Sequence, residues 1–361
     1  MKLAFWLALA AGPLAVLLWM AGGWWPPVVE ALYSRGLYPW VMAPVSRALA
    51  ALPFAVAPVL LVAGVLAAVG ALFLHPRGWM GVLAGLSVLV AWFILGWGLN
   101  YQRESWAANV GWTVRGGTVA ELDALARDLA ARVGPLRAQA WKDGPPPWLK
   151  LIRAIPAAYD HAALRWPLLA GQFAAPKASP APESMSWLGI SGIYMPFTGE
   201  PLVNTGPGQW SLPFTAAHES AHLHGWARED EANFLAFLVL RDCGDPRLEY
   251  SAWSMALLYV AEALGSAAPD GAARWKAIAA TLPHDVLEDW RSYFRYWDRF
   301  KGPVQQAAQS VNDAYLKVQG QADGVKSYGR MVDLLLAAEA VWGSTSGPGE
   351  STPAPSKPAP R

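Results

Sequence analysis

Three long apolar runs without any charged residue occupy most of the first hundred positions of the chain, at residues 3–23, 52–74 and 79–99. Each is long enough for an α-helix to cross the hydrocarbon layer of a membrane, which takes about 20 residues. Buried core helices are the alternative, but three uncharged runs so close together favour membrane spans. We therefore predict an integral membrane protein whose residues 1–100 form a membrane domain with three transmembrane helices.

The first run also has features of a cleaved secretory signal, because an apolar stretch follows Lys2 directly. However, the bulky sequence WMAGGWWPP stands where a signal peptidase site needs small residues. The run is also longer than the apolar region of a signal peptide, which has about 7–15 residues. We therefore predict that it remains as an uncleaved span.

The pattern changes to mixed polarity after residue 101, as in a folded domain outside the bilayer. Thr118 and Glu121 form a helix start with a capping box, and apolar residues at helical spacing follow as far as Gly134-Pro135. Small and aromatic residues alternate in 185–206, which indicates one or two short strands. From residue 212 the pattern is helical again. We predict a mainly α domain at 101–343 with a short edge strand or small sheet, followed by a disordered Pro/Ser-rich tail at 344–361.

The charges near the spans give two opposing signals for membrane orientation. Lysine and arginine counts slightly favour a cytoplasmic position for residues 101–343. Against this, a very short head carrying Lys2 is normally retained inside, and the loop at residues 22–49 has the Trp, Tyr and Pro content of an amphipathic interfacial segment. We expect the domain after the spans to be extracytoplasmic.

Composition narrows the range of partners. Hydrophobic residues make up 54% of the chain, above the usual range of about 45–50%, and the excess lies in the apolar runs. The formal net charge is +1 and no cluster of Lys and Arg is interleaved with aromatics, so nucleic acid is not an expected partner. The single cysteine, Cys243, excludes an intramolecular disulfide and a cysteine-rich metal site. Membrane lipid is an expected partner, and the oligomeric state is left open.

The stretch HESAH holds the candidate chemistry. Residues four apart lie on the same face of a helix, so His218 and His222 can direct both imidazoles at one metal ion. Glu219 lies beside them without occupying a coordination position. In this order of residues the metal polarises water and the substrate carbonyl, while the glutamate transfers the proton to the leaving amine. Catalytic zinc normally has three protein ligands, so a third ligand is required.

Two nearby positions do not supply that ligand. The pattern HExxHxxGxxH finds its glycine at Gly225, but its last position is Arg228, which excludes a metzincin. His224 is only two positions after His222, so helical geometry turns it away from the metal. We interpret it as a surface residue or as a neighbour of the site.

The acidic residues after the motif are the remaining candidates. If Gly225 ends the first helix, a second helix begins near Arg228. Glu231 then shares a face with the apolar stripe of this second helix (Phe234, Leu235 and Leu238), and a carboxylate on an inward-facing stripe needs a strong partner such as a metal. Glu229 and Asp230 fit better as exposed acids in the first turn. Glu231 is therefore the preferred ligand, with Glu229 as the alternative.

At this point the residues show a family resemblance. The motif at 218–222 followed by EDEANFLA at 229–236 resembles gluzincin-type zinc metallopeptidases, including bacterial anti-repressor and radiation-response peptidases. The chain as a whole is similar to bacterial membrane proteins grouped as the domain of unknown function numbered 3810, through its spans and its blocks GISGIYMPFTGE, LPFTAAHESAHLHGWAREDEANFLAF and VNDAYLKVQGQADGVKSYGRMVDLLL. The resemblance implies a zincin-like domain with one zinc ion. It also implies His218, His222 and Glu231 as ligands and Glu219 as general base. The interval from His222 to Glu231 is shorter than in most gluzincins.

The expected function is a membrane-anchored zinc metallopeptidase that acts on a peptide or protein substrate. The alternative is a non-catalytic metal-binding membrane protein that acts as a binding or regulatory module. Glu219 favours the enzyme, because a structural site needs no acid beside its ligands and is usually closed by four of them. A transporter is disfavoured because the spans contain no ionisable residue. Residues 192–197 could pair with a substrate backbone or form a plain structural strand, and Tyr315 and Tyr328 are possible oxyanion donors for which packing roles are favoured.

Overall fold

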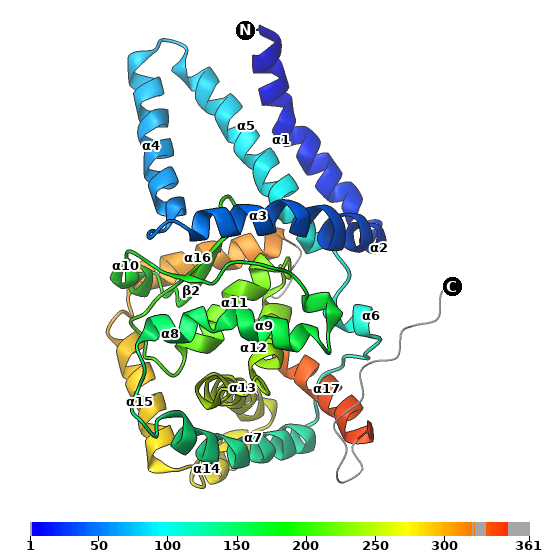
Figure 1. The fold of residues 1–361 in the computed structure, drawn as a ribbon, viewed down its shortest axis with the longest axis vertical. Helices are drawn as coiled ribbons and strands as arrows, with labels where there is room; N and C mark the ends of the chain where they lie inside the picture. Colours follow the sequence, from blue (N-terminus) through cyan, green and yellow to red (C-terminus); the bar gives the residue numbers. More distant parts are fainter. Residues whose placement is uncertain (1, 320, 322–329, 346–361) are drawn as a thin grey trace.

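The structure is a computed structural model that describes residues 2–319, 321 and 330–345. Three apolar helices at the N-terminal end project away from the rest of the chain (Figure 1): α1 (Lys2–Gly22), α4 (Val56–Leu74) and α5 (Gly78–Gly96). All three are long and apolar enough to cross a membrane, and most of their side chains are exposed. The predicted long apolar helices are thus confirmed in number and position as candidate membrane spans, and α5 packs between α1 and α4.

A continuous helical segment connects the first span to the second. It consists of α2 (Pro26–Val28), the π-helical η1 (Val29–Leu37) and α3 (Tyr38–Ala50), and it runs crosswise beneath the spans (Figure 1). Trp24 and Trp25 just before this segment and Trp40 within it are largely exposed, whereas Tyr38 and Met42 are buried against the domain below. Exposed tryptophans at this level are typical of a helix lying in the membrane interface.

The rest of the chain is a mostly helical body around one core. The central helix α13 (Pro246–Ala267) packs on α7 (Val119–Ala140), α11 (Leu212–Leu223) and α12 (Glu229–Leu240). The other helices are η2 (Gly98–Gln102), α6 (Trp106–Val110), α8 (Trp148–Arg153), α9 (Ile155–Ala163), η3 (Pro167–Leu169), α10 (Pro182–Trp187), α14 (Gly271–Ala279), α15 (His284–Asp298), α16 (Pro303–Val318) and α17 (Met331–Thr345). The mainly α fold is as predicted.

Helix α7 differs from its predicted length. Thr118 and Glu121 form the expected capping box, but the helix continues through Pro135 to Ala140. Val133 and Ala140 are both buried, and Arg137 pairs with Asp289 on α15. Packing on both sides of the proline therefore outweighs the lost backbone hydrogen bond.

A small sheet lies between the crosswise segment and α11. Its strands are β1 (Lys177–Ala178), β2 (Gly192–Met195) and β3 (Glu200–Val203), in the order β1-β3-β2. β1 is parallel and β2 is antiparallel to β3, so β2 forms one edge of the sheet. This confirms the predicted small sheet. The carboxylate of Glu200 accepts hydrogen bonds from the first backbone N–H groups of α4, which fixes the sheet to that span.

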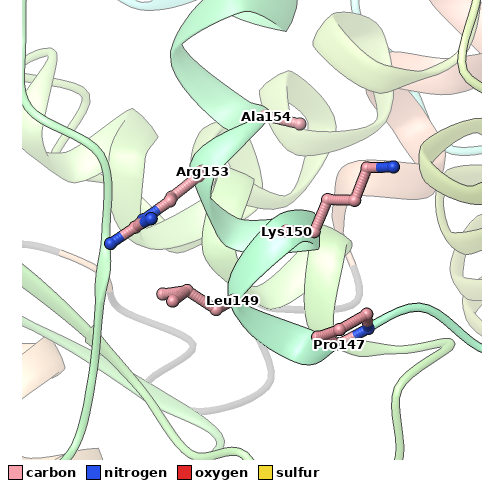
Figure 2. Close-up of a pocket in the computed structure, with 5 residues that line it drawn as sticks. All are labelled: Pro147, Leu149, Lys150, Arg153 and Ala154. Atoms are coloured by element: carbon pink, nitrogen blue, oxygen red, sulfur yellow. The ribbon is translucent and has the colours of Figure 1, made fainter.

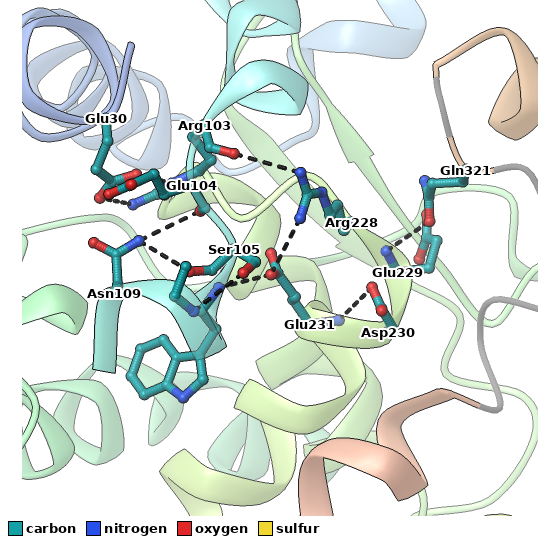
Figure 3. A network of polar contacts seen from close by, with 12 residues as sticks. Glu30, Arg103, Glu104, Ser105, Asn109, Arg228, Glu229, Asp230, Glu231 and Gln321 are labelled. Carbon is teal, nitrogen blue, oxygen red and sulfur yellow. Dashed lines mark hydrogen bonds and ion pairs between the residues drawn. The ribbon is translucent and has the colours of Figure 1, made fainter. Parts of the chain in front are cut away.

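A buried ion pair joins the crosswise segment to the domain (Figure 3). The guanidinium of Arg103 donates to both carboxylate oxygens of Glu30, at 2.7 Å each. It also donates to the carbonyl of Gly225 at 3.0 Å and lies 3.6 Å above the Trp226 ring. The predicted disordered tail begins inside α17, and its residues 346–361 lie outside the described part of the chain.

Candidate metal centre

The motif residues lie on α11, and α11 and α12 meet at a tight turn. Pro213 is in the first turn of α11, where its missing N–H costs nothing. Gly225 has φ of +82°, a left-handed conformation that favours glycine, and it ends α11 as predicted. A Cβ at this position would also lie 3.1 Å from the side-chain oxygen of Asn100. The chain reverses here, and α12 begins at Glu229.

The structure brings His218, His222 and Glu229 together in a buried group. The Nε2 atoms of the two imidazoles are 3.2 Å apart. The Oε2 atom of Glu229 lies 3.1 Å from Nε2 of His218 and 3.5 Å from Nε2 of His222. Four ligands about 2.0–2.1 Å from a tetrahedral zinc ion are about 3.3 Å apart. The three donor atoms therefore have the mutual spacing that a zinc site requires.

Glu231, the preferred ligand from the sequence, is not in this group. Its Oε1 atom accepts the backbone N–H of Trp106 at 2.7 Å, and its carboxylate lies 3.7 Å from Arg228 (Figure 3). Two residues along a helix differ by more than half a turn, so Glu229 and Glu231 cannot face the same point. The group that could hold a metal ion thus contains Glu229, the alternative from the sequence, in place of Glu231. The inward-facing carboxylate of Glu231 did need a strong partner, but that partner is a buried amide and an arginine.

Hydrogen bonding fixes the orientation of His222. Its Nδ1 atom lies 2.8 Å from the carbonyl oxygen of Trp226. A carbonyl can only accept, so Nδ1 carries a proton and Nε2 is the nitrogen that faces the group. A second interaction of this kind is typical of histidines that bind metals. Sequence reasoning missed the role of Trp226, since a backbone acceptor has no signature in the side-chain pattern.

The charges in the group favour a cation. Burial opposes ionisation of Glu229, but the charges and hydrogen bonds of His222 and His218 outweigh it and hold the pKa of this carboxyl well below its usual range. Burial likewise opposes protonation of His222, but the charges of Glu229 and Glu219 raise its pKa to about 9. A negative field that stabilises a positive charge on His222 also stabilises a metal cation at the same point.

Glu219 lies beside the group and is buried from solvent. Burial raises its pKa to about 7, although His218 and His222 act in the opposite direction. The backbone of Tyr194 on β2 donates a hydrogen bond to this carboxylate. A Cβ added at Gly192 would lie 2.5 Å from Oε1 of Glu219 and 2.7 Å from Cγ2 of Thr215. Gly192 was not singled out in the sequence, yet its missing side chain makes room for Glu219.

The unpaired edge of β2 faces Glu219. The N–H of Asn204 donates to the carbonyl of Ser191 at 2.8 Å, so these two residues form a hydrogen-bonded pair of the antiparallel ladder. Such pairs alternate with pairs whose N–H and C=O groups point outward. Gly192 and Tyr194 therefore direct their backbone groups away from β3, and the hydrogen bond from Tyr194 to Glu219 agrees with this direction.

Three other residues considered in the sequence have different positions. His224 is directed away from the group, as predicted, but it is buried: its ring stacks on Tyr159 with 4.1 Å between centroids. This burial lowers its pKa to about 3, so the imidazole is neutral. The hydroxyl of Tyr315 on α16 lies 3.2 Å from that of Tyr101, and burial together with the charge of Glu229 raises its pKa to about 12. Tyr328 lies outside the described residues.

The described part of the chain also has a hollow that contains none of these residues. It has a volume of about 450 Å³, follows α8 and is lined by Pro147, Leu149, Lys150, Arg153 and Ala154 (Figure 2). Its only charged side chains are the two basic ones. Since it offers no carboxylate or imidazole, it contributes nothing to the chemistry of the centre.

Comparison with known proteins places the chain in a sequence group without assigning an activity. A family model described as "Protein of unknown function (DUF3810)" matches residues 33–336. The matched range includes α3, the sheet, α11 and α12, and with them every residue of the centre. No curated protein and no solved structure matches the chain.

Proposed function

The chain belongs to the DUF3810 family, and from its buried centre we propose that it is a membrane-anchored, zinc-dependent metallopeptidase. One observation carries the proposal: three donor atoms with the spacing of a zinc site lie next to a buried carboxylate whose pKa is raised to about 7. Two imidazoles and one carboxylate form a ligand set of catalytic zinc. The carboxylate of a second helix supplies the third donor, as in gluzincins.

The proposed mechanism assigns separate roles to the residues of the centre. His218, His222 and Glu229 would hold the zinc ion, which when bound supplies Lewis-acid activation of water and of the peptide carbonyl. Glu219 accepts a proton from the attacking water as its oxygen bonds to the carbonyl carbon. The same carboxyl then donates that proton to the amine nitrogen as the C–N bond breaks. Its buried position beside His218 and His222 places this carboxylate next to the metal-bound reactants for both transfers.

Substrate alignment is assigned to β2. The N–H and C=O groups of Gly192 and the C=O group of Tyr194 face away from β3 and can pair with an extended peptide, as in other cases of strand addition to a sheet edge. A peptide bound there would lie next to Glu219, because the same edge contacts this carboxylate. We further propose that the centre is on the extracytoplasmic side of a bacterial plasma membrane.

Metal removal tests the proposal directly. Purified full-length protein should contain about one zinc per chain and should cleave members of a peptide library. A strong chelator should reduce cleavage to background, and one equivalent of zinc should restore it. Elemental analysis and mass spectrometry of the products provide the two measurements. Stoichiometric zinc without any cleavage would instead support a non-catalytic binding module, and cleavage that persists in metal-free protein would contradict the mechanism.

Gly192→Ala provides a second test, because the new methyl group would displace Glu219. We expect peptide cleavage to fall about 10–100-fold, since a misplacement of about 1 Å at a reacting group has effects of this size. The loss should appear mainly in kcat, while zinc content remains that of the unaltered protein. Gly265→Ala on α13 is the matched control, because a Cβ there meets no atom within 4 Å. Unchanged kcat in Gly192→Ala would show that this close approach is irrelevant to catalysis.

A further inference from the structure

The centre is held by the membrane-facing parts of the protein. Trp97 directly follows the last residue of α5, and its indole N–H donates to the carbonyl of His222 at 3.1 Å. The two rings lie 6.1 Å apart between centroids. From the crosswise segment, the hydroxyl of Tyr38 donates to the carbonyl of Leu223 at 2.9 Å. The side chain of Trp97 thus directly connects the end of α5 to His222, a candidate ligand.

The same level of the molecule carries the features of a membrane surface. The exposed tryptophans of α3 and of the residues before α2 lie at the lower end of the spans (Figure 1). Tryptophan side chains of this kind concentrate at the boundary between lipid and water. The bilayer surface therefore passes close to α3, and α11 lies just below it.

The edge strand β2 leads from Glu219 to this boundary. It begins at Gly192, against Glu219, and runs towards the turn that contains Phe197. The carbonyl of Phe197 accepts the indole N–H of Trp92 at 3.2 Å, and its ring lies 6.2 Å from that of Phe93. Trp92 and Phe93 belong to α5, about one helical turn before its end. One end of β2 is thus at the catalytic glutamate and the other reaches a span.

We propose that the substrate is a membrane-anchored protein, cleaved in the extended segment next to its own transmembrane helix. This inference rests on the proposed peptidase function. A peptide paired with the free edge of β2 has one end at Glu219 and the other at the bilayer. At about 3.3 Å per residue, the scissile bond would lie within roughly five to ten residues of the membrane surface.

A peptide free in solution fits this arrangement less well. The contacts of Phe197 with α5 place the far end of the strand against the span, so an extended peptide continuing beyond it would meet lipid. A substrate chain that leaves the bilayer near Phe197 can pair directly with the free edge of β2. Anchoring also restricts the substrate to the membrane plane, which raises its effective concentration at the centre.

The experiment compares one randomised peptide segment in two forms. Full-length zinc-loaded protein is reconstituted in lipid nanodiscs with a segment of about 20 residues, long enough to extend well past the expected window. The segment is either attached to a single apolar helix in the same bilayer or supplied without that helix. We expect at least a tenfold preference for the anchored form, with cleavage sites, mapped by mass spectrometry, clustered within about ten residues of the helix.

The outcomes separate this inference from the proposed function. Equal cleavage of the free segment, or cleavage sites spread evenly along the anchored one, would overturn the membrane-proximal substrate and leave the peptidase intact. Absence of cleavage of both forms by zinc-loaded protein would overturn both.

Cross-linking provides a readout that does not depend on turnover. In the Glu219→Gln protein, a photoreactive residue replaces Ile193 on β2, whose side chain is 38% exposed. It should cross-link to the anchored segment at positions next to the helix. The same residue in place of Leu164, an exposed position after α9, is the control and should give only background. Equal labelling from both positions would contradict substrate binding along β2.

Discussion

Glu219→Gln is expected to reduce peptide cleavage by about 10²–10⁴-fold, the usual contribution of a general acid or base. The amide has nearly the same shape as the carboxylate, and its oxygen can still accept the N–H of Tyr194, so the centre should keep its structure. It cannot accept a proton from water. The measurement is kcat on a cleaved library peptide, beside zinc content by elemental analysis, which should be unchanged.

The control for this variant is Glu262→Gln on the exposed surface of α13, which should cleave the peptide at the normal rate. A Glu219→Gln protein with nearly normal kcat would remove Glu219 from the mechanism. If zinc content fell together with kcat, the variant would report on metal binding instead, and Glu219 would have to be reconsidered as a ligand.

Glu229→Ala is expected to reduce zinc from about one ion per chain to background, because only two donor atoms of the group remain. Glu231→Ala should keep its zinc and lose stability instead. It leaves the buried N–H of Trp106 without its acceptor, which costs about 1–3 kcal/mol in the free energy of unfolding. This pair of variants separates the two carboxylates that the sequence alone could not separate.

Thermal unfolding with and without added zinc measures both effects in one experiment. A ligand that binds only the folded state raises the melting temperature. Zinc should therefore stabilise the unaltered protein and Glu231→Ala, and it should have no effect on Glu229→Ala. The opposite pattern, in which zinc stabilises Glu229→Ala but not Glu231→Ala, would restore Glu231 as the ligand.

Local patterns were sufficient for a large part of the structure. The three spans follow from runs of apolar residues, the start of α7 from its capping box, and the shared face of His218 and His222 from their spacing. Each of these features depends on neighbours within a few residues along the chain. The end of α11 at Gly225 belongs to the same class, since a left-handed turn calls for glycine.

The features that sequence reasoning missed depend on distant contacts. Glu231 finds its partner in Trp106, which is 125 positions away. His224 was expected near the surface but is enclosed by the ring of Tyr159 from α9. The proximity of Gly192 to Glu219 requires that β2 lies across α11. None of these contacts between distant residues leaves a repeat or a characteristic spacing in the sequence.

The ion pair between Glu30 and Arg103 determines whether the spans can be separated from the rest of the protein. A cut in a loop between Glu30 and Arg103 would break the backbone, but the helical body would stay attached to the crosswise segment. The ion pair is buried, and Arg103 also contacts the Gly225 carbonyl and the Trp226 ring. Removing the first hundred residues altogether would take away both the carboxylate partner of Arg103 and the segment that covers it, next to the turn at Gly225 and Trp226. Release of the helical body from the first hundred residues is therefore expected to disturb the turn between α11 and α12, on which the geometry of the proposed centre depends.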